Sequence, residues 1–305
     1  FAIKEKAISD RIRAQGGYDA VYPGAEAFLS NKPVTTDVTV WPSTASIDPM
    51  MPDTQKQGCY TGFGDDEIHM TKKDGSPCFY GDARSDKTLY VVGGSHSEHY
   101  IAALEDIAAR RGIKIIPLIK MGCPLYHPSK WDGSEFSDCL AWSDKVMDFI
   151  EKNPPTEGVF MVGTRPENIF GRGPEVVPQN YVDVSRRLSQ MGVHQWLVRD
   201  NPWMMQGEDN LQQKDVRVCM DDIRDERICG QDESVSLSDP QLMEKSYDGI
   251  GNITFVDVTD GFVKDGFIYP VVGGVLVYRD SHHFTKQFAY TLKNALEQQM
   301  FPKTP

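Results

Sequence analysis

The sequence lacks a long apolar run, a block of basic residues and any cysteine pair with the spacing of a metal site. Its longest apolar stretches, residues 115–119 and 271–278, are far too short to span a membrane. There are 32 Lys and Arg against 44 Asp and Glu, which gives a net charge of −12 without any Lys/Arg-rich segment. That balance argues against a nucleic-acid partner, because neutralising a phosphate backbone requires clustered positive charge.

The sequence also lacks the motifs of metal sites and of internal repeats. No CxxC motif and no His/Cys group has zinc-finger spacing, so we expect no structural zinc. The acidic groups Asp65-Asp66-Glu67 and Asp221-Asp222 are expected to be solvated rather than to bind calcium. No internal repeat, heptad run or low-complexity tract is present. We therefore expect neither a metal nor an organic cofactor.

What is present is the composition of a soluble globular protein. The chain has 305 residues, 40% of them hydrophobic and 25% charged, enough for one large domain or two smaller ones. It begins at Phe1 without a methionine or a basic-then-apolar leader. We therefore expect a processed fragment from which any targeting segment has been removed.

Six cysteines fall at Cys59, Cys78, Cys123, Cys139, Cys219 and Cys229. Read in order they make three local pairs, although six cysteines allow many pairings and spacing alone does not decide between them. Six unpaired buried thiols in a cytosolic enzyme are the alternative. We expect three local disulfides and an extracytoplasmic location.

The chain divides into an irregular first part and a regular second part. In residues 1–81 a helix is expected over 1–15, and residues 32–81 are rich in Pro, Thr, Asp and Gly. This first part is predicted to be an irregular, disulfide-tied segment that packs on a core domain of residues 82–305. From Thr88 onward, apolar runs alternate with helical patterns. Strands are expected at residues 88–92, 113–119, 158–163, 195–199 and 253–258. Helices are expected at residues 97–111, 137–152, 179–191, 238–247 and 285–300, with Ser238 as an N-cap and Gly112 as a C-cap. This alternation predicts an α/β fold with a central parallel sheet of about five strands between two layers of helices.

The first predicted strand ends in Gly93-Gly94-Ser95-His96, directly before a helix. In open α/β sheets the active site forms outside the carboxyl ends of the strands. A serine on this tight turn exposes its hydroxyl and has its amide at a helix N-terminus, which suits a nucleophile whose intermediate carries an oxyanion. Taken alone, the same residues are more often just a turn and an N-cap serine.

A second cluster, Asp280-Ser281-His282-His283, lies just before the last predicted helix. An Asp three residues before a His can fold back and hold the imidazole, leaving its other nitrogen free to take a proton from a serine. His282 and His283 compete for the role of base, and the spacing from Asp280 favours His283. The alternative is a surface aspartate beside two solvated histidines.

Together these segments resemble the SGNH/GDSL hydrolase superfamily, and more narrowly the SGNH domain fused to acyltransferase-3-type membrane proteins of actinobacteria. Residues 93–96 match the family's Gly-Asp-Ser-His block, residues 122–125 its Gly/Ala-Cys-Pro-Pro block, and residues 278–285 its Tyr-Arg-Asp-x-x-His-Leu-Ser/Thr block. Residues 22–25 and the positions of the later cysteines are also similar. The resemblance covers nearly the whole chain and implies a three-layer α/β/α, flavodoxin-like fold.

The resemblance also implies roles for individual residues. Ser95 would be the nucleophile, His283 the general base and Asp280 its orienting carboxylate, with the amides of Ser95 and Gly122 in the oxyanion hole. Gly94 stands where the family has Asp, and the family's third oxyanion donor, an Asn, is absent. Arg165 or Thr164 would supply that donor, with Asn168 a weaker candidate. Of the local pairs that the cysteine order gives, the resemblance supports Cys123–Cys139 and Cys219–Cys229, and Cys59–Cys78 is the third pair in that order.

Other residues near these motifs have supporting interpretations. His96, Gly94 and His282 are candidates for lining the pocket, and His99 is expected to be solvated or packed. Trp203-Met204-Met205 is expected to be loop core rather than a substrate platform.

The function implied is a serine O-acyltransferase on the extracytoplasmic face of the membrane, with acetyl as the expected acyl group. The acceptor would be a hydroxyl of a cell-envelope glycan or glycolipid. An acyltransferase-3 transmembrane domain, in the same full-length chain, would be its partner. An SGNH esterase that deacetylates carbohydrate or lipid is the first alternative. A non-catalytic envelope-binding module with a degenerate site is the second.

Overall fold

A computed structural model describes residues 18–35, 38–126, 137–168 and 170–302. The helix expected over residues 1–15 lies outside these ranges. The centre of the fold is a six-stranded sheet in the order β1-β3-β2-β4-β7-β11. Its strands are β1 (Tyr80–Gly81), β2 (Thr88–Gly93), β3 (Lys114–Ile119), β4 (Gly158–Val162), β7 (Gln195–Val198) and β11 (Ile253–Val256).

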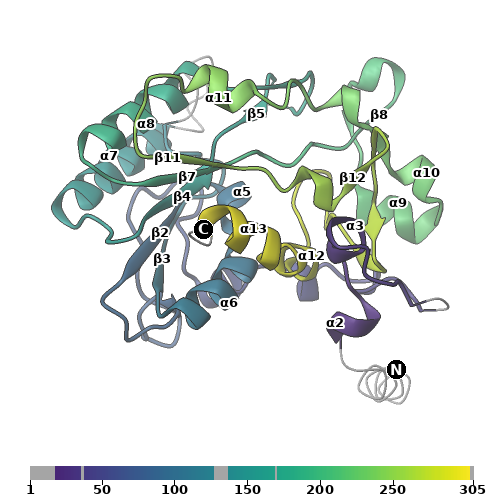
Figure 1. The fold of residues 1–305 in the computed structure, drawn as a ribbon, viewed down its shortest axis with the longest axis horizontal. Helices are drawn as coiled ribbons and strands as arrows, with labels where there is room; N and C mark the ends of the chain where they lie inside the picture. Colours follow the sequence, from purple (N-terminus) through teal and green to yellow (C-terminus); the bar gives the residue numbers. More distant parts are fainter. Residues whose placement is uncertain (1–17, 36–37, 127–136, 169, 303–305) are drawn as a thin grey trace.

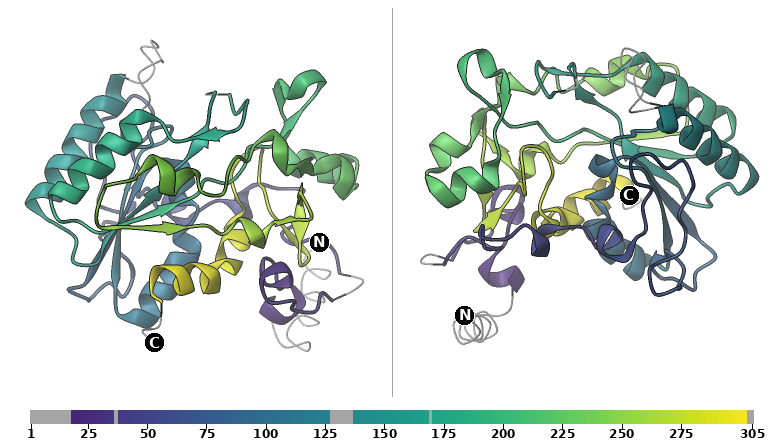
Figure 2. Two further views of the ribbon diagram at one scale, coloured as in Figure 1. Left: turned by 45° about the horizontal axis from the view of Figure 1, so that its top comes forward. Right: turned by 180° about the vertical axis from the view of Figure 1, so that it is seen from behind.

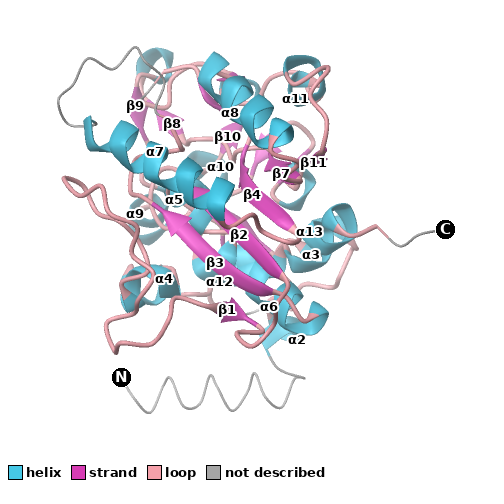
Figure 3. Cartoon of the chain, turned by 90° about the vertical axis from the view of Figure 1, so that its left-hand side faces the viewer, coloured by secondary structure: helices cyan, strands magenta, loops and turns pink. Residues whose placement is uncertain are grey.

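Five of these strands are parallel, and they are the five that the apolar runs predict. Only the two-residue β1 runs antiparallel, pairing with β3 at the edge of the sheet (Figure 3). Helices cover both faces of the sheet, so nearly every residue of a central strand such as β2 is buried. Strands of this kind are therefore continuous apolar runs in the sequence. The predicted α/β class with about five parallel strands is therefore confirmed.

Two layers of helices enclose the sheet, as Figure 1 shows. On one face α7 (Ser137–Lys152) and α8 (Gln179–Gln190) bury Trp142 and Leu188 against the strands. On the other face lie α6 (Ile101–Arg111), α12 (Lys286–Thr291) and α13 (Lys293–Met300). Each layer contributes its own apolar core, and the sheet separates the two.

The strand order places a crevice at the end of β2. This strand lies between β3 and β4, so the chain leaves it toward one side of the sheet and later returns to the other. Such a switch point is where open parallel sheets bind ligands, outside the carboxyl ends of the strands. The residues that directly follow β2 therefore occupy the most favourable position for a site.

Two predicted helices are interrupted. The helix expected at 97–111 starts earlier, as α5 (Ser95–Glu98), and breaks before α6 where His99 and Tyr100 turn inward to pack on Phe284. The last helix breaks at Leu292. There the Thr291 hydroxyl donates to the carbonyl of Phe288 and accepts the amide of Ala25, in competition with the regular helix ladder.

The prediction of a helix beginning at Ser238 is wrong. The helix there is the shorter α11 (Leu242–Ser246), and Ser238 caps nothing. Its amide and hydroxyl bind Glu175 instead, and its carbonyl accepts from Arg199. The buried ion pair of Arg199 and Glu175 thus holds Ser238 outside the helix.

The remaining elements are short and lie mainly away from α7 and α8 (Figure 2). The helices are α2 (Tyr18–Val21), α3 (Glu26–Leu29), α4 (Asp53–Gln57), α9 (Val216–Asp222) and α10 (Glu226–Cys229), with 3₁₀ turns at Asp48–Met50, Glu208–Asn210, Glu233–Val235 and Thr259–Gly261. The strands are β5 (Arg165–Pro166), β6 (Glu175–Val176), β8 (Met205–Gln206), β9 (Gln212–Gln213), β10 (Gln231–Asp232), β12 (Val263–Lys264), β13 (Phe267–Ile268), β14 (Val271–Val272) and β15 (Val275–Leu276). Within the described ranges, no helix has the length and apolar character needed to cross a bilayer.

Three disulfides tie the chain locally, in the three pairs that the order of the cysteines predicts. They join Cys59 to Cys78, Cys123 to Cys139 and Cys219 to Cys229. The second joins the segment after β3 to the start of α7, next to the carboxyl ends of β2 and β3.

Replacing Cys123 and Cys139 together by Ser should lower the free energy of unfolding by about 3 kcal/mol, because the unfolded chain loses the constraint of a loop of this length. Urea unfolding of the oxidised wild type and the double variant measures the difference. The matched Cys219→Ser/Cys229→Ser variant should lose slightly less, since its pair is separated by 10 residues against 16. An unchanged unfolding free energy in the first variant would contradict the expectation.

Candidate active site

Ser95 follows directly from the way β2 ends. Gly93 has a φ of +121°, a region open to glycine, and a Cβ there would lie 3.0 Å from the hydroxyl oxygen of Ser97. Gly94 is the N-cap position of α5, and Ser95 is its first residue. The amide of Ser95 is thus among those that a helix's first turn leaves without an intrahelical partner.

The structure brings Ser95, His283 and Asp280 into one hydrogen-bonded row. Oγ of Ser95 lies 2.7 Å from Nε2 of His283, and Nδ1 of His283 lies 2.8 Å from Oδ2 of Asp280. An ionised carboxylate only accepts, so Nδ1 carries the proton and Nε2 accepts from the serine hydroxyl. Residues 188 positions apart thus lie in the order that a nucleophile, its base and an orienting carboxylate would require.

The carboxylate of Asp280 is held by its own loop. Its other oxygen accepts the amides of His282 at 2.9 Å and His283 at 2.8 Å. Beside it lies the buried Arg279, whose guanidinium donates to the carbonyl of Phe284 and stands 3.8 Å from Asp280. The loop therefore fixes the position of the carboxylate before any substrate binds.

Burial and charge set the protonation of this pair. Burial raises the pKa of Asp280, but three effects outweigh it and hold that pKa far below its usual range: the hydrogen bond from His283, the charges that His283 and His282 carry at acid pH, and the charge of Arg279. Burial lowers the pKa of His283 to about 4, although Asp280 acts in the opposite direction. At neutral pH the carboxylate is therefore ionised and the imidazole neutral, so its Nε2 is able to accept a proton.

A pocket of about 190 Å³ opens beside Ser95. Its walls include Phe63, the Gly122–Pro124 segment and Trp203, together with all three sequence candidates for pocket lining: Gly94, His96 and His282. The candidate oxyanion donors Ser95, Gly122, Thr164 and Arg165 line it as well. Asn168 does not: it is exposed, and its side chain accepts from the amide of Phe170.

Thr164 and Arg165 differ in how they are held. Thr164 is fully buried, and its hydroxyl accepts the amide of Asp200 at 2.9 Å, so its own proton is still available for a second bond. Arg165 is half-buried and hydrogen bonds to Tyr181 in the pocket wall. Both side chains reach the pocket, which keeps both as candidates for the third donor.

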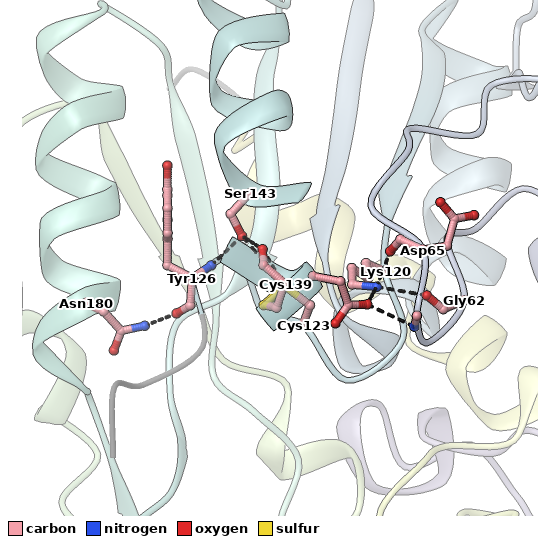
Figure 4. The surroundings of a disulfide bond; sticks show 10 residues. Gly62, Asp65, Lys120, Cys123, Tyr126, Cys139, Ser143 and Asn180 are labelled. Atoms are coloured by element: carbon pink, nitrogen blue, oxygen red, sulfur yellow. Dashed lines mark hydrogen bonds and ion pairs between the residues drawn. A yellow bond between two sulfur atoms is a disulfide. The ribbon is translucent and has the colours of Figure 1, made fainter. Parts of the chain in front are cut away.

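A buried lysine, Lys120, lies near the Cys123–Cys139 disulfide and binds the loop of Gly62 and Asp65 (Figure 4). Lys120 donates to the carbonyls of Gly62 and Asp65 and to the carboxylate of Asp138, at 2.8, 2.5 and 2.6 Å. Gly62 and Asp65 flank the pocket residue Phe63, and Asp138 precedes Cys139 of the nearby disulfide. Sequence analysis missed Lys120, for which the one available signal was a lysine directly after a buried apolar strand.

A second row of polar side chains, also missed as a unit, runs beside the first. Nδ1 of His96 lies 2.6 Å from Asp200, and Nε2 of His96 lies 2.9 Å from Nδ1 of His282. Trp203 stacks on His282 with ring centroids 3.9 Å apart. The expectation that Trp203 is loop core is therefore wrong: Met204 and Met205 are buried, whereas the Trp203 ring lines the pocket because stacking on His282 holds it there.

The residues that could hold a metal are the three histidines of these two rows. Nitrogens of His96, His282 and His283 lie within 4.8 Å of one another, and imidazole suits zinc and similar ions. These nitrogens already bind one another, Ser95 or the two aspartates, so a metal would displace those bonds. Nearby, His99 is buried against Tyr100 and Phe284, and burial holds its pKa well below the usual value.

Comparison with known proteins identifies the family. The family described as "SGNH domain (fused to AT3 domains)" matches residues 58–298. The chain belongs to this SGNH family. No curated protein matches it. Among solved structures, the periplasmic domain of the lipopolysaccharide acetyltransferase of Salmonella ser. Paratyphi A is similar, with a TM-score of 0.48 and 13% identity over 72% of this chain and 86% of that one.

The protonation of the SGNH domain's Ser95–His283–Asp280 row can be measured directly. In an NMR titration of the histidine side chains, His283 should titrate well below pH 6.5, because burial disfavours its charged form. Asp280→Asn should lower the pKa of His283 further, since the carboxylate raises it. A wild-type titration at or above pH 6.5, or an upward shift in Asp280→Asn, would contradict this picture.

Proposed function

We propose that this SGNH domain is an extracytoplasmic serine O-acyltransferase that moves an acyl group, expected to be acetyl, through an acyl-enzyme on Ser95. The acceptor is a hydroxyl of a cell-envelope glycan or glycolipid. The observation that carries the proposal is the unbroken row from Ser95 through His283 to Asp280 at the pocket. Membership of a family fused to AT3 domains supports acyl transfer as the reaction class.

In the first half-reaction His283 takes the proton of Ser95 while the serine oxygen attacks the carbonyl carbon of the donor. The negative charge that develops on the carbonyl oxygen would be received by the amides of Ser95 and Gly122. Arg165 or Thr164 is proposed as the third donor, and removing one such donor typically costs roughly 3–4 kcal/mol. His283 then protonates the leaving group, which leaves the acyl group on Ser95.

In the second half-reaction His283 takes the proton of the acceptor hydroxyl, whose oxygen attacks the acyl carbon and releases Ser95. Water in place of the acceptor makes the same site an esterase. A neutral His283 serves transfer and hydrolysis equally well. What distinguishes a transferase from an esterase is therefore whether an acceptor or water binds beside His283. The half-buried wall of Trp203 and His282 at the pocket supports an acceptor more complex than water.

A degenerate binding module fits the geometry poorly. A site without a catalytic role has no physical reason to keep a serine hydroxyl 2.7 Å from a neutral, carboxylate-bound imidazole. Glycine at position 94, where the family has Asp, does not distort the turn that carries Ser95. Gly94 has a φ of −93°, which other residues also adopt, and a Cβ there would make ordinary contacts of 3.5 Å with Cys123.

The partner proposed is the AT3 transmembrane domain of the full-length protein, which would deliver the acyl group to Ser95 on the extracytoplasmic side. The three disulfides fit that oxidising side of the membrane. Equal transfer by the isolated domain and by the full-length protein in membranes would contradict this division of labour.

Ser95→Ala and His283→Ala should each lower kcat/KM for hydrolysis of p-nitrophenyl acetate by about 10³-fold or more, because nucleophile and base act as one unit. The double variant should lose little beyond either single change.

Ser30→Ala and His69→Ala are the matched controls, since both side chains are exposed and neither lines the pocket. Circular dichroism and thermal unfolding establish that each variant is folded. Full activity in a folded Ser95→Ala protein would overturn the proposal.

A further inference from the structure

A second hydrogen-bonded row, Asp200–His96–His282, lies beside the row that ends on Ser95. The side chains of Asp200 and His96 are only 6% and 14% exposed, and the two bonds of the row are 2.6 and 2.9 Å long. Asp200 follows the carboxyl end of β7, while His96 and His282 are the immediate neighbours of Ser95 and His283. The proton transfers described above use none of these three side chains.

The direction of the bonds in this row follows from its first member. With one proton on the ring of His96, at Nδ1, that nitrogen donates to the carboxylate of Asp200, and Nε2 of His96 is left with a lone pair. Nδ1 of His282 must then donate to that lone pair. Burial and the neighbouring imidazoles hold the pKa of His282 well below its usual value, so this ring is neutral as well. Its remaining nitrogen, Nε2, therefore presents a lone pair.

The ring of His282 is held firmly in that orientation. It lies nearly coplanar with His96, at an interplanar angle of 9°, and Trp203 stacks on it. Trp203 in turn packs on Gly171, where a Cβ would come within 2.5 Å of the indole. The backbone carbonyl of His282 accepts from the side chain of Asn201 at 2.6 Å.

Nε2 of His282 is available to a ligand. Among the residues that the structure describes, none forms a hydrogen bond with Nε2 of His282. This atom is also absent from the fully buried side-chain atoms that lack a partner, so it is accessible from the pocket. His282 lines the pocket beside Ser95, and its ring centroid lies 4.0 Å from that of the base His283. The lone pair of His282 Nε2 thus lies at the pocket, next to the imidazole whose Nε2 accepts the hydroxyl of Ser95.

We propose that Nε2 of His282 accepts a hydrogen bond from a second hydroxyl of the acceptor, adjacent to the one that reacts. The site would then select acceptors with neighbouring hydroxyls, as sugars have, over simple alcohols. This rests on the proposed acyltransferase function. The reacting hydroxyl gives its proton to His283, its oxygen forms the new ester bond, and the bond from the acyl carbon to Ser95 breaks with return of the proton to Oγ. His282 binds the second hydroxyl and transfers no proton.

The test uses p-nitrophenyl acetate as donor and compares cis-1,2-cyclohexanediol with cyclohexanol as acceptor. The quantity measured is acetylated alcohol formed per acetate released. Both products come from the same acyl-enzyme, so the ratio does not depend on the rate of acylation. The wild type should favour the diol, per hydroxyl, by roughly five- to tenfold, the factor expected of one hydrogen bond.

His282→Asn and His282→Gln form a matched pair of variants. Asn places its amide where Nδ1 lies and leaves nothing at Nε2, so it should abolish the preference for the diol. Gln reaches the position of Nε2 and should retain part of that preference. His282→Phe, which keeps a ring against Trp203, separates loss of the nitrogen from loss of the stack.

A readout independent of turnover is the protonation of the ring nitrogens, seen by ¹⁵N NMR of histidine-labelled protein. Nε2 of His282 should be unprotonated in the wild type. It should become protonated in Asp200→Asn, because an amide can donate to His96 and reverse both bonds. A protonated Nε2 in the wild type would overturn the proposal.

The kinetic outcomes separate this proposal from the one on which it rests. An equal diol preference in folded His282→Asn and wild type would overturn the role of His282, and so would Ser95-dependent hydrolysis without transfer to either alcohol. Both results would leave the Ser95 mechanism standing. Absence of any Ser95-dependent turnover would overturn the proposed function and the acceptor role with it.

Discussion

The site depends above all on how Asp280 is bound. One oxygen of this carboxylate accepts two backbone amides, and the other accepts Nδ1 of His283. The first pair of bonds fixes the carboxylate, and the third fixes the tautomer and the plane of the imidazole. Nε2 of His283 is then directed at Ser95 without any contribution from the substrate. Because these three side chains are already in position, the protein does not spend free energy on moving them during the reaction.

The fold supplies the other half of this arrangement. The strand order creates a crevice at the end of β2, and Gly93 allows the sharp turn that places Ser95 in it. Lys120 and the Cys123–Cys139 disulfide then hold the Phe63 and Gly122 walls beside the serine. Residues far apart in the sequence thus hold the walls of one pocket. The same loop that carries His283 also places His282, so a second imidazole lies next to the first.

Much of this was predictable, for identifiable reasons. Parallel strands covered on both faces read as apolar runs, so all five could be located from the sequence. Ser95 and the Asp280–His283 pair stand in local motifs, and local spacing carries their geometry. Asp200 and Lys120 carry no such motif, because their partners lie on distant segments. The helix breaks at His99 and Leu292 likewise result from tertiary packing, which local propensity does not contain.

The central claim is that Ser95 carries the acyl group between donor and acceptor. Its most direct test is to mix the protein with p-nitrophenyl acetate, stop the reaction in acid within the first turnover, and locate the acetyl group by peptide mass spectrometry. The account predicts one acetyl group on Ser95, its loss on adding a polyol acceptor, and none in His283→Ala. Turnover without any acetyl group on Ser95, or one that persists in the presence of water and acceptor, would contradict it.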